Sequence, residues 1–120
     1  MDKKAYSGAI GEVYAARYLR QNGFDILSAN YRKRFGEIDI VAYRDKCICF
    51  VEVKTRSGDM IASPAEFVDE RKQKRISAVA ARYMQDEKDY TARFDVIEIY
   101  LDDDGALIDI NHIRNAFDLA

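Results

Sequence analysis

The feature that most constrains the fold is a pair of apolar segments with strand character, Glu37 to Tyr43 and Cys47 to Lys54. A short polar turn around Asp45 separates them, which predicts a β-hairpin. Its two faces carry, respectively, Val41, Tyr43, Ile48 and Phe50, and Ile38, Ile40, Ala42, Cys49, Val51 and Val53. Because both faces are apolar over most of their length, the two strands are expected in the centre of a sheet that is covered on both sides.

Charged residues break this apolar pattern at one end of the hairpin. Since alternate residues of a strand share a face, Glu52 and Lys54 point the same way. Glu37 and Asp39 do so on the neighbouring strand. A turn of two or four residues places Asp39 opposite Glu52, whereas a three-residue turn would place it opposite Val51 and separate the two carboxylates. We therefore predict an even-numbered turn.

The facing carboxylates of Asp39 and Glu52 need a counter-charge, because they repel each other and are costly to bury unpaired. A divalent cation removes both costs, and oxygen ligands suit Mg²⁺ or Mn²⁺. The pattern thus predicts a metal bound by these two residues. Lys54 beside it would orient a nucleophilic water or stabilise charge on a phosphoryl group. A plain cross-strand ion pair between Glu37 and Lys54 is the simpler alternative.

A helix is predicted before the hairpin, from Lys4 to Asn22, because apolar residues recur there at helical spacing and Gly23 is a common helix stop. Glu12 lies on this helix. The residues three and four positions from it are all small: Gly8, Ala9, Ala15 and Ala16. Because a face of small residues can approach another backbone closely, we expect Glu12 to reach the charged end of the sheet as a further metal or water ligand.

The remaining segments complete a single domain over residues 1–120. Further strands are expected at Phe24 to Tyr31, Phe94 to Leu101 and Leu107 to Ile110, with helices from Pro64 to about Met84, broken near Asp69, and from His112 to Phe117. This order is typical of a mixed α/β sandwich with helices on both faces of the sheet.

Composition narrows the class of protein. The formal net charge is only -2, which argues against a protein that coats nucleic acid indiscriminately. No segment has the apolar length that a bilayer requires, and the first residues do not form a signal peptide. A cytoplasmic location without membrane attachment is therefore expected.

Several segments together resemble the YraN family of bacterial predicted endonucleases. They are Gly11-Glu12, Gly36 to Ala42, Phe50 to Arg56, Lys72 to Ile76, Arg93 to Val96 and Ile113 to Phe117. That family is similar to the restriction-endonuclease-like superfamily and, within it, to archaeal Holliday junction resolvases. The resemblance implies an α-β-β-β-α-β core with a mixed central sheet flanked by helices.

The same resemblance implies a function and a role for each site residue. Asp39 and Glu52 would bind Mg²⁺ or Mn²⁺ with help from the backbone carbonyl of Val53, Lys54 would be catalytic, and Glu12 would complete the site. The implied activity is metal-dependent endonucleolytic hydrolysis of phosphodiester bonds in DNA, with branched or structured DNA as the candidate substrate.

Positive side chains cluster on both sides of this site and could contact phosphates. The candidates are Arg32, Lys33, Arg34, Arg56, Lys72 and Gln73. For Lys72 and Gln73, a solvated helix face explains the sequence equally well. Two other functions remain open, a non-catalytic nucleic-acid-binding module and a dimerising adaptor of a DNA-processing complex. A homodimer is compatible with all three.

Overall fold

A computed structural model describes residues 3–57 and 68–118. Its elements are α1 (Lys3–Gln21), β1 (Asp25–Lys33), β2 (Gly36–Arg44), β3 (Cys47–Ser57), α2 (Glu70–Met84), β4 (Thr91–Leu101) and β5 (Leu107–Phe117). Within these residues, five strands form one sheet in the order β1-β2-β3-β4-β5. β3 and β4 run parallel and the other neighbours antiparallel. The mixed sheet and the α-β-β-β-α-β order are thus confirmed.

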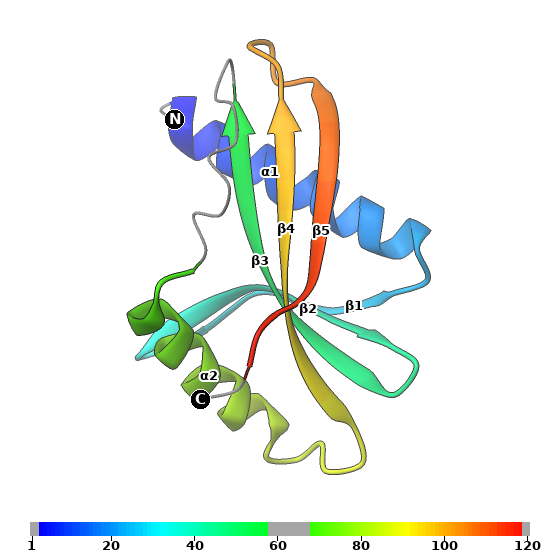
Figure 1. Ribbon diagram of the computed structural model, residues 1–120, viewed down its shortest axis with the longest axis vertical. Helices are drawn as coiled ribbons and strands as arrows, with labels where there is room; N and C mark the ends of the chain where they lie inside the picture. The colour runs from blue at the N-terminus through cyan, green and yellow to red at the C-terminus, as the bar shows by residue number, and fades with distance from the viewer. Residues whose placement is uncertain (1–2, 58–67, 119–120) are drawn as a thin grey trace.

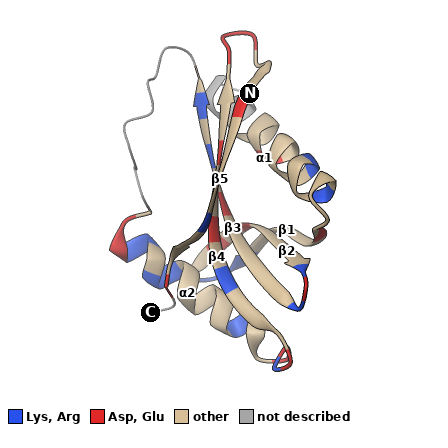
Figure 2. Ribbon diagram, turned by 45° about the vertical axis from the view of Figure 1, so that its right-hand side comes forward, with Lys and Arg blue, Asp and Glu red and all other residues tan. Residues whose placement is uncertain are grey.

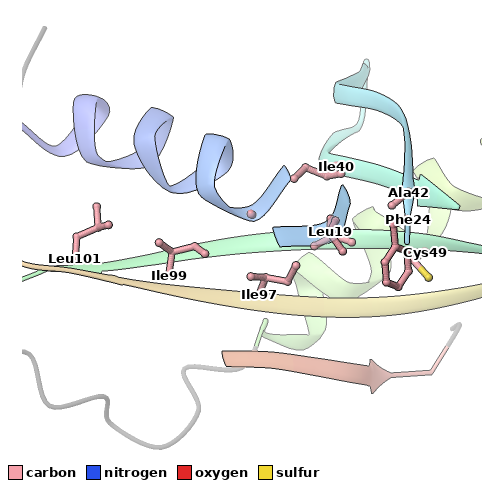
Figure 3. Packing of buried hydrophobic residues seen from close by; sticks show 10 residues of the cluster. Leu19, Phe24, Ile40, Ala42, Cys49, Ile97, Ile99 and Leu101 are labelled. Carbon is pink, nitrogen blue, oxygen red and sulfur yellow. The ribbon is translucent and has the colours of Figure 1, made fainter. Parts of the chain in front are cut away.

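The two helices cover opposite faces of the strongly twisted sheet (Figure 1). On the α1 side, the buried core consists of Ala15, Leu19, Phe24, Ile40, Ala42, Cys49, Val51, Ile97, Ile99 and Leu101 (Figure 3). On the α2 side, it consists of Ile38, Val41, Ile48, Phe50, Val68, Ile76, Val79, Ala80, Phe94 and Val96. The central strands β2, β3 and β4 contribute to both cores, which explains why their sequences are apolar on both faces.

The turn between β2 and β3 decides which residues face each other. Asp45 and Lys46 form a two-residue turn with φ of 51° and 63°. Two successive left-handed residues are typical of the tight turns that match the twist of paired strands. The pairing from Arg44↔Cys47 through Ile40↔Val51 follows. The predicted even-numbered turn is thus confirmed, and the recorded pairing ends one residue before Asp39 and Glu52.

One side chain of the hairpin lies on the face opposite to the predicted one. Ile38 belongs to the α2-side core, whereas strict alternation would group it with Ile40 on the α1 side. The recorded pairing of β2 with β3 ends at Ile40↔Val51. Beyond it the Asp39 carboxylate, instead of a backbone carbonyl, accepts from the Val53 N–H. We attribute the change of face to this departure from regular pairing.

The predicted helix from His112 to Phe117 is wrong, because these residues continue β5 and pair with β4. A six-residue helix is marginal alone, whereas the strand supplies hydrogen bonds to the buried β4. The register shifts between Phe94 and Val96, and Asn115 has a left-handed φ of 51°. This irregularity produces the apolar spacing that resembles a helix.

The helix break predicted near Asp69 coincides with the start of α2. α2 starts at Glu70, where the side chain of Asp69 caps it by accepting from the Lys72 N–H at 2.9 Å. An aspartate at this position satisfies a backbone donor that the first helical turn leaves unpaired. The predicted start at Pro64 lies outside the described residues.

α1 packs closely on β3 at Gly11, and this contact brings Glu12 to the charged end of the hairpin. A Cβ added at Gly11 would lie 1.9 Å from Thr55 Oγ1 and 3.1 Å from Thr55 Cβ. Gly11→Ala should therefore destabilise the protein by roughly 1–3 kcal/mol, measured by urea denaturation. Gly8→Ala is the matched control, since its Cβ would meet nothing within 4 Å. Equal stability of the two variants would contradict the close approach.

Candidate active site

The charged end of the β2–β3 hairpin opens into a pocket of about 170 Å³ beneath α2. Its lining residues are Gly36, Glu37, Asp39, Glu52, Lys72, Arg75 and Ile76. α2 can lie close here because a Cβ added at Gly36 would already be 3.1 Å from Val79 Cγ2. Lys and Arg residues recur along α2 (blue in Figure 2). The pocket thus brings acidic side chains of the sheet against basic side chains of a helix.

Asp39 occupies a partly buried position in this pocket. Its Oδ2 accepts a hydrogen bond from the backbone N–H of Val53 at 2.9 Å. Burial and, next, the nearby Glu52 carboxylate raise the pKa of Asp39 to about 7, although the Val53 N–H acts to lower it. Without a bound cation, Asp39 therefore holds a proton more strongly than an ordinary aspartate does.

Glu52 is the more deeply buried carboxylate, with its side chain 9% exposed. It forms an ion pair and hydrogen bond with the ammonium of Lys72, which comes from the first turn of α2. Burial acts to lower the pKa of Lys72, but its hydrogen bond with Glu52 and the charges of Glu52 and Asp39 outweigh burial and raise it. Lys72 is therefore a charged member of the site.

Glu12, on α1, lies close to the acidic residues of the hairpin. The amide nitrogen of Asn30, turned toward the acidic groups, donates to Glu12 Oε1 and to Glu37 Oε1, each at 3.0 Å. Burial, then the charges of Glu37 and Glu52, raise the pKa of Glu12. Asn30 thus connects the helical carboxylate to the hairpin.

Lys54 lies next to the pocket on β3. It is half-buried and close enough to the ammonium of Lys72 to affect the pKa of that group. Glu37 forms its ion pair with Arg32, at 3.3 Å, instead of the alternative pair with Lys54. The structure therefore gathers Glu12, Asp39, Glu52 and Lys54 around one region.

The predicted nucleic-acid contacts are arranged less uniformly. Arg34 is exposed in the β1–β2 turn, and Arg32, although paired with Glu37, keeps 74% of its side chain exposed. The ammonium of Lys33 lies 5.1 Å from the centre of the Tyr31 ring.

The other predicted contacts have partners within the protein. Arg56 is only 9% exposed and pairs with Glu98 at 3.6 Å. Gln73 donates to the carbonyl of Val68 at 2.7 Å. The side chain of Lys72 turns into the pocket toward Glu52. Among the predicted nucleic-acid contacts, the exposed side chains are therefore those of Arg32 on β1 and Arg34 in the β1–β2 turn.

The donor chemistry suits a metal that keeps most of its water. In the described parts of the chain, no three His, Cys, Asp or Glu side chains converge closely enough to hold a metal. Mg²⁺, however, is usually held in proteins by one or two carboxylates together with water molecules. Asp39 and Glu52, with the Val53 carbonyl nearby in the chain, fit that requirement, and Glu12 could act through water.

Two residues of the site were missed by sequence reasoning in the roles that they occupy. The sequence suggests Lys72 as a contact to nucleic acid and gives no role to Asn30. Lys72 lies in a segment shared with the YraN family, but that segment does not reveal its partner, because Lys72 reaches Glu52 only through the packing of α2 on the sheet. Asn30 lies in none of the shared segments. Asn30 has a left-handed φ of 53°, a conformation that asparagine tolerates better than most residues. That tolerance is a weak signal for a special backbone position.

Comparison with known proteins places the chain in a family. The family model described as "Uncharacterised protein family UPF0102" matches residues 11–99. A UPF0102 protein of Alkaliphilus oremlandii is 46% identical over 98% of this chain and 100% of its own length. One of Trichlorobacter lovleyi is 48% identical, over 94% and 91%. One of Caldanaerobacter subterraneus subsp. tengcongensis is 42% identical, over 92% and 93%.

These matches cover the pocket and most of the sheet. None of the described helices is long and apolar enough to cross a membrane. The resemblance to the YraN family, which the sequence motifs indicated, is confirmed. The chain belongs to the uncharacterised protein family UPF0102, the YraN family.

Proposed function

We propose that this protein is a metal-dependent endonuclease that hydrolyses phosphodiester bonds in DNA. The observation that carries the proposal is that Asp39 and Glu52 line one pocket together with Lys72, while the Glu12 carboxylate lies close enough to raise the pKa of Asp39. Such a set lowers the stability of the folded protein unless a cation offsets the charge, because buried like charges repel. Carboxylates with adjacent ammonium groups suit the chemistry of phosphoryl transfer.

Each residue has a role in this proposal. Asp39 and Glu52 would hold Mg²⁺ or Mn²⁺ together with the Val53 carbonyl, and Glu12 would orient a water at the edge of the site. The metal, when bound, would act as a Lewis acid toward the scissile phosphate. Lys54 would orient the attacking water or stabilise negative charge on the phosphoryl oxygens.

The substrate is proposed from the same features. Arg32, which pairs with the pocket residue Glu37, and Arg34 in the β1–β2 turn would contact the phosphate backbone without reading its sequence. Branched or structured DNA is the candidate substrate that the family resemblance implies. A symmetric homodimer would present two such sites to one junction. The cytoplasmic location predicted from the sequence would place the protein with DNA.

The alternatives predict no dependence on a metal. A non-catalytic nucleic-acid-binding module or a dimerising adaptor could keep the fold without the site. Neither explains why the carboxylates of Asp39 and Glu52 line the same pocket. Metal binding therefore discriminates the proposed nuclease from both alternatives.

The proposal is tested by calorimetric titration with Mn²⁺ of the wild type and of the Asp39→Ala, Glu52→Ala double variant. We expect binding by the wild type and its loss in the double variant, while Asp103→Ala, in the exposed β4–β5 turn, behaves like the wild type. On a DNA substrate found by screening, Asp39→Ala should lower cleavage at least about a hundredfold. Unchanged cleavage by folded Asp39→Ala would refute the assignment.

A further inference from the structure

In the ion pair between Lys72 and Glu52, the ammonium group of the protein itself occupies a carboxylate that the proposed metal site needs as a ligand. We infer that Lys72 is the resident counter-ion of the pocket and that it leaves Glu52 when a divalent cation binds. This inference rests on the proposed metal site and concerns how the charge of that site is neutralised in the absence of metal.

The two cations compete for the same carboxylate. Lys72 Nζ donates to Oε1 of Glu52, whose side chain is 9% exposed. A divalent cation held by Glu52 would lie next to the ammonium of Lys72. Two unscreened positive charges so close together repel strongly in a partly buried site. Occupation of Glu52 by the metal and by Lys72 is therefore mutually exclusive.

The structure provides a route for the exchange. The Lys72 side chain is 40% exposed, so it can swing toward solvent without unfolding its surroundings. Its backbone stays in place because its N–H donates to Asp69 Oδ1 at 2.9 Å, which caps α2. Glu52, in contrast, is fixed within the central strand β3. The lysine moves and the carboxylate remains.

The exchange also changes the charge of the pocket wall. Arg75, one turn further along α2, lines the same pocket as Lys72. While Lys72 is paired with Glu52, its positive charge is neutralised within the pocket and is not available to a phosphate group. Once released, the ammonium would join Arg75 on the wall that faces an incoming phosphate. Lys72 would thus exchange the Glu52 carboxylate for the phosphate of the substrate as its partner.

The first experiment tests the counter-ion without any metal. In EDTA, Lys72→Met should lower the melting temperature, because it leaves Glu52 buried without its partner. Adding Glu52→Gln to this variant should recover most of the loss. Lys74→Met, at an exposed position on the same helix, is the matched control and should leave the melting temperature unchanged. Equal melting temperatures of the Lys72→Met and Lys74→Met variants would refute the proposal that Lys72 is the counter-ion of Glu52.

The second experiment tests displacement by calorimetric titration with Mn²⁺. Lys72→Met should bind Mn²⁺ about tenfold more tightly than the wild type, since no cation must first be removed. Lys74→Met should bind like the wild type. Equal or weaker binding by Lys72→Met would overturn the displacement. If no variant binds Mn²⁺, the proposed nuclease site and the displacement both fail, and the melting experiment alone decides whether Lys72 is a counter-ion.

Discussion

The Asp39→Asn variant is expected to be more stable than the wild type in metal-free buffer at pH 8, by about 2 kcal/mol after allowance for partial exposure of the side chain. The reason is that folding moves the Asp39 carboxylate next to Glu52 and away from water, which raises its pKa to about 7. Asparagine carries no charge, yet its side-chain oxygen can still accept the hydrogen bond from the Val53 N–H.

The sign of the pH dependence follows from the direction of this shift. The pKa of Asp39 is raised on folding, so between about pH 4 and 7 the folded protein binds the proton more strongly than the unfolded chain does. The stability of the wild type relative to Asp39→Asn should therefore fall across this range and level off above pH 7. Below about pH 4, where both states are protonated, the two proteins should differ least.

Thermal unfolding of both proteins in EDTA at several pH values measures the effect. At pH 8 the variant should melt roughly 5–10 °C above the wild type. Addition of Mn²⁺ should raise the melting temperature of the wild type and leave the variant unchanged, because only the wild type keeps the metal ligand. A difference between the two proteins that is the same at pH 5 and pH 8 would contradict the raised pKa.

The second large effect is expected at Asp95, a carboxylate on β4 with no solvent exposure of its side chain. It accepts hydrogen bonds from the Arg93 guanidinium at 2.8 and 2.9 Å and from the Asn115 N–H at 3.1 Å. His112 Nε2 lies 2.7 Å from its Oδ2, and the Tyr18 hydroxyl lies 3.0 Å from His112 Nδ1. Asp95 thus joins α1, β4 and the edge strand β5.

Hydrogen bonding decides the ionisation of this carboxylate. Burial alone would raise the pKa of Asp95, but the hydrogen bonds from His112, Arg93 and Asn115 outweigh burial and lower it to about 2. The stability that Asp95 contributes is therefore present above its unfolded pKa of about 4 and is lost as the pH falls toward 2. This dependence is opposite in sign to that of Asp39.

Asp95→Ala should destabilise the protein by about 3–5 kcal/mol, because it leaves the buried His112 ring and the partly buried Arg93 guanidinium without their acceptor. Urea denaturation at pH 7 measures the change in the free energy of unfolding. Asp103→Ala, in the exposed β4–β5 turn, is the control and should change stability by less than about 0.5 kcal/mol. A loss at Asp95 no larger than that at Asp103 would show that the network contributes nothing.

Local chemistry made much of the fold predictable. The helical spacing and Gly23 predicted α1 because a helix needs an apolar stripe and a residue that can end it. The apolar segments and the polar turn predicted the β2–β3 hairpin. Register followed from the turn, since an odd number of turn residues would have moved Asp39 out of line with Glu52. The failure at His112 to Phe117 arose where β4 imposes an irregular pairing that local spacing cannot express.

The amino-acid sequence by itself determined the central hairpin, its two-residue turn, and the position of Glu12 on the first helix. These follow from short-range geometry, which neighbouring residues set. Only the tertiary structure decided that Lys72 neutralises Glu52, that Arg56 is buried against Glu98, and that Asp95 is held ionised by groups from other elements. Those outcomes depend on burial and on partners distant in the chain. The free energy of a charge is set by what surrounds it, which sequence spacing does not record.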